Sequence, residues 1–368
     1  MTRTRSEPLR EKPAAETPVF ELIDVEKTFQ VPKPGRRFSR ETVGLKALDG
    51  VRLRINDGAS LALVGESGSG KSTLLRVLLG LDAPTDGRAN YRGRPISDVR
   101  SKGTEFARDV ALVYQDARGS LDPRMTVGAL IAEPLRHFGI VSRDEEPARV
   151  AQLLDRVGLP VDTAQRYPSG LSGGQVRRVA IARALASEPS VLVADEAVSG
   201  LDVSTQAQLL TLLRGLQQDM GLTLVFITHD LGVASYLCEK IAIMYLGRIV
   251  ETGATNDVLA APAHPYSAAL RAAAPRFFEP LPEPLPGEIP SPLDLPKGCR
   301  FSTRCPAVKG DCRTRDPYLA QHGAGRSVAC LHPLSEGEGL PLVSDADMSS
   351  TAVAADIQNQ TDTPLSRD

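Results

Sequence analysis

The stretch SLALVGESGSGKSTLLRVLLGL, from Ser60 to Leu81, decides the fold of this chain. It begins with a short apolar run of strand length and ends with an apolar segment of helical character. Between them GESGSGKS, from Gly65 to Ser72, fits the pattern G-x-x-x-x-G-K-[ST]. A glycine-rich turn that joins a strand to a helix is the context that a phosphate-binding loop requires. We therefore expect an α/β fold with a phosphate site, rather than a glycine-rich turn that only precedes a helix.

The residue types of this loop explain how it would hold a phosphate. Glycines let the backbone N–H groups turn toward the phosphate oxygens, and the N-terminus of the following helix adds partial positive charge. Lys71 would reach the terminal phosphates, and Ser72 would offer its hydroxyl to Mg²⁺. The candidate phosphate-binding residues are Gly65, Glu66, Ser67, Gly68, Ser69, Gly70, Lys71, Ser72 and Thr73.

A second motif, VLVADE at residues 191–196, supplies acidic groups after an apolar run. Asp195 would hold the Mg²⁺ shell, and Glu196 is placed to polarise a water molecule. An apolar run that ends in Asp-Glu is a weak signal alone. Together with the phosphate loop it indicates a nucleotide hydrolase.

Other segments fit the same architecture. SVLVADEAVSGLD at 190–202 and LTLVFITHD at 222–230 are apolar runs that end abruptly in polar residues. Such runs suit strands buried on both faces of a sheet, with function at their C-terminal ends. Residues from about 116 to 188 look mostly helical. The run VFELIDVEKTFQ at 19–30 reads as a strand, and the basic loop after it reads as a solvated hairpin insertion rather than a lipid-facing patch.

The composition is that of an ordinary globular protein. The 368 residues are 42% hydrophobic and 24% charged, with a formal net charge of −2, which is ordinary for a globular protein and gives no support for nucleic-acid binding. No run approaches the roughly 20 apolar residues that span a bilayer, and the N-terminus has no apolar signal region. We expect a cytoplasmic compartment. Residues 1–17 and 335–368 are polar and are expected to be a disordered leader and tail.

LSGGQVRRVAIARALASEP, from Leu171 to Pro189, predicts a capped helix. Ser172 and Gln175 have the S-x-x-Q spacing of a capping box, so the helix should begin there and end before Pro189. Two glycines at its start leave backbone N–H groups unobstructed, as in a second anion-binding helix N-terminus. On this local chemistry an ordinary capped helix explains the segment equally well.

Taken together, LSGGQ, GESGSGKST and VLVADE resemble the ATP-binding subunits of ABC transporters, whose signature is LSGGQ. The resemblance covers roughly residues 19–334. It implies a P-loop NTPase fold, namely an ABC-type ATPase core at 18–274 with an antiparallel β subdomain and a helical subdomain at about 116–188. A small cysteine-containing extension at 275–334 would follow the core.

The resemblance also implies that two such domains pair head-to-tail, with each ATP between one phosphate loop and the partner's LSGGQ. By position, Phe29 would stack on adenine, Gln115 would contact Mg²⁺ with Ser72 and Asp195, and His229 would act in catalysis with Glu196. The partner's γ-phosphate would be gripped by Ser172, Gly173, Gly174 and Gln175, with Asp202 crossing the interface. Phe29 could equally be a core residue. Ala197 and Gly170 depart from the residues common in relatives, and neither is a presumed catalytic group.

Four further stretches look like the oligopeptide/dipeptide/nickel branch of ABC importers. They are SLDPRMTVGALIAEPL, DVSTQAQLL, HPYSAALRAAAP and GEIPSPLDLPKGCRFSTRCP. The branch implies peptide import, with a nickel or glutathione importer as the alternative. It further implies a peripheral position at the cytoplasmic face of the inner membrane, two permease subunits, an extracytoplasmic solute-binding protein and a second homologous ATPase, with a heterodimer favoured. A soluble ABC ATPase outside transport is the alternative of another class, and a non-hydrolysing ATP-binding regulator is disfavoured because Glu196 and His229 are both present.

Four of the five cysteines lie in the extension, at Cys299, Cys305, Cys312 and Cys330. The C-x₂₋₄-C spacing of structural zinc sites is absent, and a cytoplasmic disulfide is disfavoured. Four thiolates fit a [4Fe–4S] cluster, which some relatives with this cysteine pattern are thought to bind, and buried free thiols are the other reading. We expect this group to lie apart from the ATP chemistry, and Cys238 to be a core residue.

Overall fold

The computed structural model describes residues 18–33, 41–101, 103–274 and 287–335. The predicted leader at 1–17, the proline-rich stretch at 275–286 and all but the first residue of the predicted tail lie outside the described residues.

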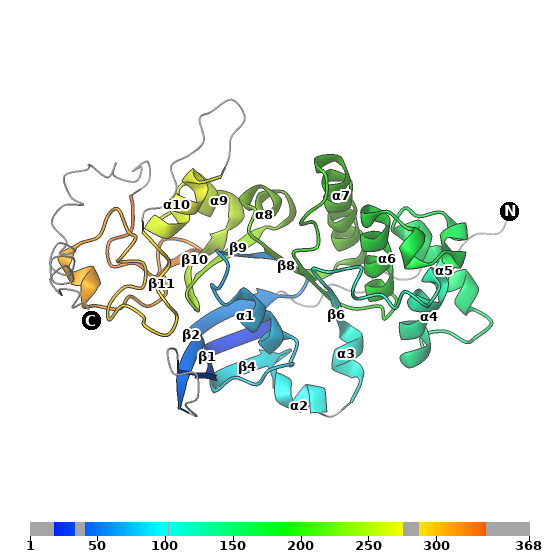
Figure 1. Cartoon of the computed structure of the whole chain (residues 1–368), viewed down its shortest axis with the longest axis horizontal. Helices are drawn as coiled ribbons and strands as arrows, with labels where there is room; N and C mark the ends of the chain where they lie inside the picture. Colours follow the sequence, from blue (N-terminus) through cyan, green and yellow to red (C-terminus); the bar gives the residue numbers. More distant parts are fainter. Residues whose placement is uncertain (1–17, 34–40, 102, 275–286, 336–368) are drawn as a thin grey trace, which may run out of the picture.

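A mixed central sheet forms the middle of the molecule (Figure 1). Strands β6, β7, β8, β3 and β9 are parallel neighbours in that order, and β10 then pairs antiparallel with β9. The apolar runs read from the sequence form β3, β7 and β8, as predicted, whereas β6, β9 and β10 had no prediction. The bounds are β3 Ser60–Val64, β6 Val110–Val113, β7 Val191–Asp195, β8 Thr223–Thr228, β9 Lys240–Tyr245 and β10 Arg248–Ala254.

A second sheet is antiparallel and has the order β2-β1-β4-β5. Pro32 at the end of β1 pairs with Thr42 at the start of β2, so the basic insertion connects the arms of a hairpin, as expected. The connecting residues 34–40 lie outside the description. The bounds are β1 Pro18–Pro32, β2 Thr42–Asn56, β4 Asp86–Tyr91 and β5 Arg94–Pro95.

Helices flank the central sheet, and those of the predicted helical region gather at one end of the long axis (Figure 1). In that region α4 is Val127–His137, α5 is Glu146–Arg156 and α6 is Gly173–Leu185. The others are α1 Lys71–Leu78, α2 Ile96–Ser101, α3 Glu105–Asp109, α7 Val203–Met220, α8 Leu231–Leu237, α9 Thr255–Ala260 and α10 Pro265–Ala272. Among the helices of the described ranges, none has the length and apolar character needed to cross a membrane.

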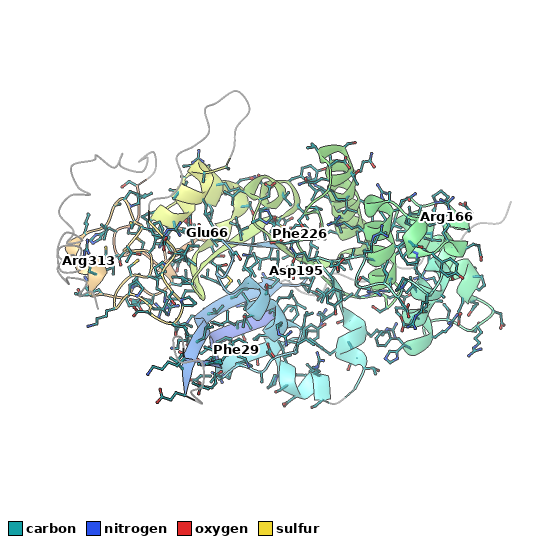
Figure 2. All side chains as sticks on the ribbon, in the orientation of Figure 1. Phe29, Glu66, Arg166, Asp195, Phe226 and Arg313 are labelled. Carbon is teal, nitrogen blue, oxygen red and sulfur yellow. The ribbon has the colours of Figure 1, made fainter. Side chains whose placement is uncertain are left out.

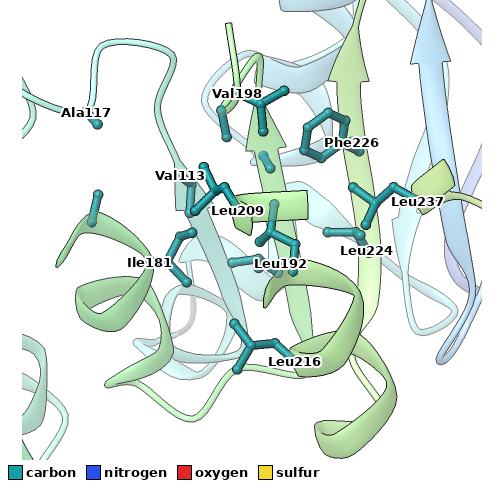
Figure 3. Packing of buried hydrophobic residues seen from close by; sticks show 14 of the residues in the cluster. Val113, Ala117, Ile181, Leu192, Val198, Leu209, Leu216, Leu224, Phe226 and Leu237 are labelled. Carbon is teal, nitrogen blue, oxygen red and sulfur yellow. The ribbon is translucent and has the colours of Figure 1, made fainter. Parts of the chain in front are cut away.

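Each central strand is buried on both faces. In β8, Leu224 and Phe226 belong to one hydrophobic cluster, whereas Val225 and Ile227 belong to the other. Alternate side chains of a strand point to opposite faces, so a continuous apolar run fills two cores. Figure 3 shows the first of these cores, in which Leu224 and Phe226 of β8 belong to the same cluster as Leu209 of α7.

The cysteine-bearing extension contributes strands to the central sheet. Its strands β11, Ala320–Gln321, and β12, Ser327–Val328, extend the sheet beyond β10. Phe301 of the extension is 1% exposed and belongs to the same hydrophobic cluster as Phe226. The extension therefore folds as one body with the ATPase core, at the end of the molecule opposite α4 and α5 (Figure 1).

Candidate nucleotide-binding site

A pocket of about 600 Å³ lies where the parallel strands β3, β7 and β8 end. Parallel strands place their carboxyl ends at one edge of a sheet, so loops far apart in sequence meet there. The pocket lining includes most of the phosphate-loop candidates together with the four residues Gln115, Asp195, Glu196 and His229. The loop members that line it are Gly65, Ser67, Gly68, Ser69, Gly70, Lys71, Ser72 and Thr73.

Two loop glycines stand where no side chain fits. A Cβ on Gly65 would lie 2.3 Å from the carbonyl oxygen of Met244. Gly70 has φ of +104° at the N-cap of α1, and a Cβ there would lie 2.7 Å from the carbonyl oxygen of Ala47. Glycine tolerates this left-handed backbone and this close approach. The loop is therefore held tightly between β9 and β2.

Lys71 is buried, 8% exposed, and its ammonium is held by its own loop. Its Nζ donates to the carbonyl oxygen of Gly65 at 2.7 Å and to that of Glu66 at 2.9 Å. Burial lowers the pKa of Lys71, and Glu196 and Asp195 oppose this effect. A positive charge is thus fixed at the phosphate loop of the pocket.

Acidic groups face this lysine across the pocket. Asp195 ends β7, and burial, with a further effect from Glu196, raises its pKa while Lys71 lowers it. Glu196 follows in a left-handed conformation, φ +43°, and its N–H donates to the carbonyl oxygen of Ile227 at 3.0 Å. Such a conformation costs on the order of 1–3 kcal/mol in a residue with a Cβ, and strain of this kind clusters at functional sites.

Glu196 is the centre of a polar cluster. Gln115 Nε2 donates to Glu196 Oε2 at 2.8 Å, and His229 Nδ1 lies 3.2 Å from Glu196 Oε1. The side chain of His229 is 64% exposed, whereas that of Glu196 is 20% exposed. The structure thus brings together three residues that are far apart in the sequence, and it leaves the histidine open to solvent.

Other candidate residues lie elsewhere. The described residues that line the pocket do not include Phe29, the LSGGQ segment or Asp202. Phe29 lies on β1 opposite Leu45, which does line the pocket, and its ring has Lys27 Nζ 5.2 Å from its centroid. Its predicted adenine contact therefore remains a prediction.

The LSGGQ segment forms the capped helix start that the sequence predicts. Gln175 N–H donates to Ser172 Oγ at 3.3 Å, and Ser172 N–H donates to Gln175 Oε1 at 3.0 Å. A Cβ on Gly174 would lie 2.5 Å from Cγ2 of Thr205, so a glycine lets α6 approach α7 closely. Asp202 caps α7 by accepting from Thr205 N–H at 2.9 Å. The starts of α6 and α7 are therefore neighbours, and Ser172 and Asp202 are both exposed.

Sequence reasoning missed contacts from the chain after β10. Tyr266 of α10 accepts a hydrogen bond at its hydroxyl from Glu66 N–H at 3.0 Å. Arg304 donates to the Glu66 carboxylate at 2.9 Å, and Pro292 lines the nucleotide pocket. In the sequence, the feature that could have indicated these contacts is the pair of arginines that stand beside cysteines in GCRFSTRC. The motif reading gave these arginines no role.

The extension cysteines gather in one place as free thiols. Burial raises the pKa of Cys305 to about 12, and Cys299, Cys330 and Cys312 are close enough to add to the rise. Burial likewise raises the pKa of Cys330 to about 11, with further effects from Cys299 and Cys312. Cys238, at the end of α8, is buried as expected, and burial raises its pKa to about 12.

Asp311 and His332 stand beside one of these thiols. The ligand atoms of Asp311, Cys312 and His332 all lie within 4.8 Å of one another. His332 Nε2 lies 2.8 Å from Asp311 Oδ1. Among the described residues, Asp311, Cys312 and His332 are therefore the one set of three or more such side chains whose ligand atoms lie close enough together to hold a metal ion.

Comparison with known families assigns both parts of the chain. Residues 48–199 match the ABC transporter family, and residues 250–312 match the family described as oligopeptide/dipeptide transporter, C-terminal region.

Individual proteins agree with this assignment. The oligopeptide transport ATP-binding protein OppF of Escherichia coli is 42% identical over 85% of this chain and 96% of its own length. The dipeptide transport ATP-binding protein DppF of Haemophilus influenzae is 41% identical over 86% of this chain and 97% of its own. A solved structure of the ATP-binding cassette MJ0796, a dimer in a post-hydrolysis state bound to ADP and Pi, superposes with a TM-score of 0.55 at 31% identity, covering 64% of this chain and 98% of that one. This chain therefore belongs to the ABC transporter family, as an ATPase subunit that carries the C-terminal region of oligopeptide and dipeptide transporters.

Proposed function

We propose that this ATPase powers the import of di- and oligopeptides through membrane permease subunits. The proposal rests on one observation: the chain combines an ABC-type pocket with the C-terminal region of oligopeptide/dipeptide transporters. The pocket contains Lys71, Glu196 and His229, and the C-terminal region packs onto it. Relatives over most of the chain are named for oligopeptide and dipeptide transport. Nickel and glutathione remain the alternative solutes.

The residues that line the pocket suggest which of them contact the phosphates, the Mg²⁺ ion and the adenine of ATP. The phosphates of ATP would lie on the loop from Gly65 to Thr73, with Lys71 neutralising the terminal phosphates. Oxygen-bearing groups of Ser72, Gln115 and Asp195 line the same pocket and fit the oxygen preference of Mg²⁺, which would neutralise charge on the phosphates. Phe29 remains our proposed adenine contact because its strand partner Leu45 lines the pocket.

Hydrolysis follows from the cluster around Glu196. A water oxygen forms a bond to the γ-phosphorus as the bond from phosphorus to the β–γ bridging oxygen breaks, and ADP leaves with that electron pair. Glu196 orients the water and receives its proton, while Gln115 and His229 hold the carboxylate from two sides. Exposed His229 is positioned to support the γ-phosphate when the site closes.

The signature helix serves a partner subunit in this proposal. Ser172, Gly173, Gly174 and Gln175 lie away from the chain's own pocket at an exposed helix N-terminus, which suits a second ATP held by another subunit. Asp202 lies on the same side, at the adjoining start of α7. We propose a heterodimer with a homologous ATPase, peripheral at the cytoplasmic face of the inner membrane, below two permeases that receive peptide from an extracytoplasmic binding protein.

For the extension we propose that Cys299, Cys305, Cys312 and Cys330 hold a [4Fe–4S] cluster. Burial raises the pKa values of Cys299, Cys305 and Cys330, other thiols of the set are close enough to add to the rise, and backbone N–H groups of Phe301, Ala307 and His332 oppose it. Such N–H contacts to sulfur are typical of iron–sulfur sites, and a cluster there would supply a rigid cross-link. Anaerobically purified protein should be brown, with stoichiometric iron; colourless protein with one zinc would instead favour the set Asp311, Cys312 and His332.

Affinity purification from detergent-solubilised membranes tests the transport proposal. The full-length chain should recover two permease subunits and a second ATPase, each identified by mass spectrometry. Recovery of ribosomal proteins or DNA-repair factors in their place would favour the soluble class of ABC ATPase and would overturn the proposal.

A further inference from the structure

The extension grips the phosphate loop through one buried arginine. Arg304 Nη1 lies 2.9 Å and Nη2 3.2 Å from the two carboxylate oxygens of Glu66, the residue after the first loop glycine. The side chain of Arg304 is 5% exposed and that of Glu66 is 26% exposed. Figure 2 labels Glu66 at the junction between the core and the extension. The residues that meet here are 238 positions apart in the sequence.

The surroundings make this contact costly to break. Arg304 lies over the ring of Tyr245 at 6.0 Å and has no partner for its buried Nε. The Glu66 carboxylate raises the pKa of Arg304, so the guanidinium stays charged. A two-point pairing of guanidinium and carboxylate fixes orientation as well as distance. Removing one partner of a buried pair leaves the other charge uncompensated.

The backbone of Glu66, which the pair with Arg304 holds in place, contacts Lys71, the proposed phosphate-binding lysine. Its carbonyl oxygen accepts from Lys71 Nζ at 2.9 Å and from Ser69 N–H at 3.2 Å. Its N–H is held by the hydroxyl of Tyr266 at 3.0 Å. The side chain of Glu66 therefore fixes a backbone unit that itself positions Lys71.

A second arginine of the same turn holds the opposite side of the loop. Arg300 donates to the carbonyl oxygen of Leu246 and to Asp49. The next residue, Gly247, donates its N–H to the carbonyl oxygen of Ser69 at 2.8 Å. In GCRFSTRC each arginine is adjacent to a cysteine, Arg300 to Cys299 and Arg304 to Cys305. The thiol-bearing turn thus braces the loop at two points.

We propose that Arg304 is a positioning residue for the phosphate loop: through Glu66 it holds Lys71 in place, so nucleotide affinity depends on the cysteine-bearing extension being folded. The inference rests on the proposed phosphate site at Gly65–Thr73. The sequence reading expected the cysteines of the extension to lie apart from the ATP chemistry. The inference instead gives the extension a role in ATP binding.

Isothermal titration of the full-length protein with MgATP, alongside steady-state ATPase kinetics, tests this role. Arg304→Gln should raise the Kd and the KM for ATP about tenfold, the scale expected when a charge-assisted hydrogen bond is lost, with kcat within about twofold. Arg304→Lys should recover part of the affinity. Arg313→Gln is the matched control, because Arg313 is an exposed arginine of the same extension (Figure 2).

A double-mutant cycle separates positioning from general stability. Glu66→Gln should weaken ATP binding as much as Arg304→Gln, and the double variant should be no weaker than either single variant. Fully additive losses, or a wild-type Kd in folded Arg304→Gln or in Glu66→Gln, would overturn the proposal. If Arg304→Gln does not fold, the Kd values of Glu66→Gln and Arg304→Lys for ATP decide whether the proposal holds. Lys71→Ala should lose ATP binding in every background; if it binds normally, the phosphate-site assignment fails instead.

Discussion

At the residue scale, Glu196 shows what the structure adds to a sequence motif. The Asp-Glu motif predicts its role, and the structure adds the two side chains that hold its carboxylate, Gln115 at 2.8 Å and His229 at 3.2 Å. Those distances could not come from the motif, because they depend on where β6, β7 and β8 end relative to one another. The sheet order that brings them together is a long-range property.

Replacing Glu196 by Gln should reduce kcat for ATP hydrolysis on the order of 100-fold, because the amide keeps the shape but cannot take the proton of the attacking water. The Kd for MgATP should stay within a few-fold of the wild-type value, since Glu196 is not assigned to phosphate binding. Phosphate release and calorimetry measure the two quantities. Glu105→Gln, an exposed glutamate on α3, is the control. A Glu196→Gln variant with near-wild-type turnover would remove this residue from the mechanism.

Arg304 shows the limit of motif reading at this scale. Its neighbour Cys305 is a candidate metal ligand in the sequence reading, whereas the arginine itself belongs to no recognisable spacing. Its function depends on the place where β10 and the extension return to the phosphate loop. Only the folded chain brings it within reach of Glu66.

At the element scale, α6 was predictable to its first residue. The S-x-x-Q spacing predicts a capping box, and both hydrogen bonds of the box are present. The strands were predictable for a related reason, since continuous apolar runs indicate burial on both faces. The bounds of α4 and α5 within 116–188 were not predictable at this level, because tertiary contacts determine where such helices end.

The caps of α6 and α4 allow a matched comparison of structure and function. Ser172→Ala and Thr126→Ala each remove a side chain that caps its helix, and each should lower the free energy of unfolding by about 1 kcal/mol. We expect a large loss of assembled-transporter ATPase activity only for Ser172→Ala, because Ser172 is assigned to the partner's nucleotide. Urea unfolding and ATPase assays measure the pair. Equal ATPase activities for the two variants would argue that LSGGQ is only a helix start.

The N-cap of α10 predicts a pH dependence of stability. His264 accepts from Tyr266 N–H at 3.0 Å, and burial lowers its pKa to about 4 from the ordinary 6.5. Between these values the unfolded chain binds a proton that the folded chain excludes. The free energy of unfolding should therefore fall by about 3 kcal/mol as the pH falls from about 7.5 to about 4, and above about pH 7.5 this histidine adds no slope.

Urea unfolding at several pH values measures that slope. His264→Asn keeps a capping acceptor but removes the titrating group, so the variant should show a flatter profile between pH 6.5 and 4.5. His322→Asn changes an exposed histidine and should keep the wild-type slope. An unchanged slope in His264→Asn would show that other groups govern acid sensitivity.

At the scale of the whole molecule, the extension is the part that sequence reasoning described least well. The family resemblance implies a boundary between residues 274 and 275, but it does not reveal how the chain beyond that boundary packs. The chain returns to the core: β12 pairs with β10, and Phe301 packs between Tyr245 and Tyr266 with ring centroids 5.4 Å from each. These pairings are long-range contacts, for which the local pattern carries no signal.

Phe301→Ala tests whether the extension and the core unfold together. Because the ring is fully buried in the main core cluster, its loss should lower the free energy of unfolding by about 3–5 kcal/mol. Unfolding should remain a single transition by fluorescence and by circular dichroism. Two separated transitions, with only the weaker one shifted by the substitution, would indicate an independent appendage.

The measurement that tests the central claim most directly is uptake of a labelled tripeptide by cells that carry either the wild-type gene or the Glu196→Gln variant at its own locus. The account predicts that the variant cells lose tripeptide uptake, while their uptake of the free amino acids is unchanged and the variant protein is still present at the membrane at wild-type levels. Tripeptide uptake at the wild-type rate in the Glu196→Gln cells would contradict the claim that ATP hydrolysis by this chain powers peptide import.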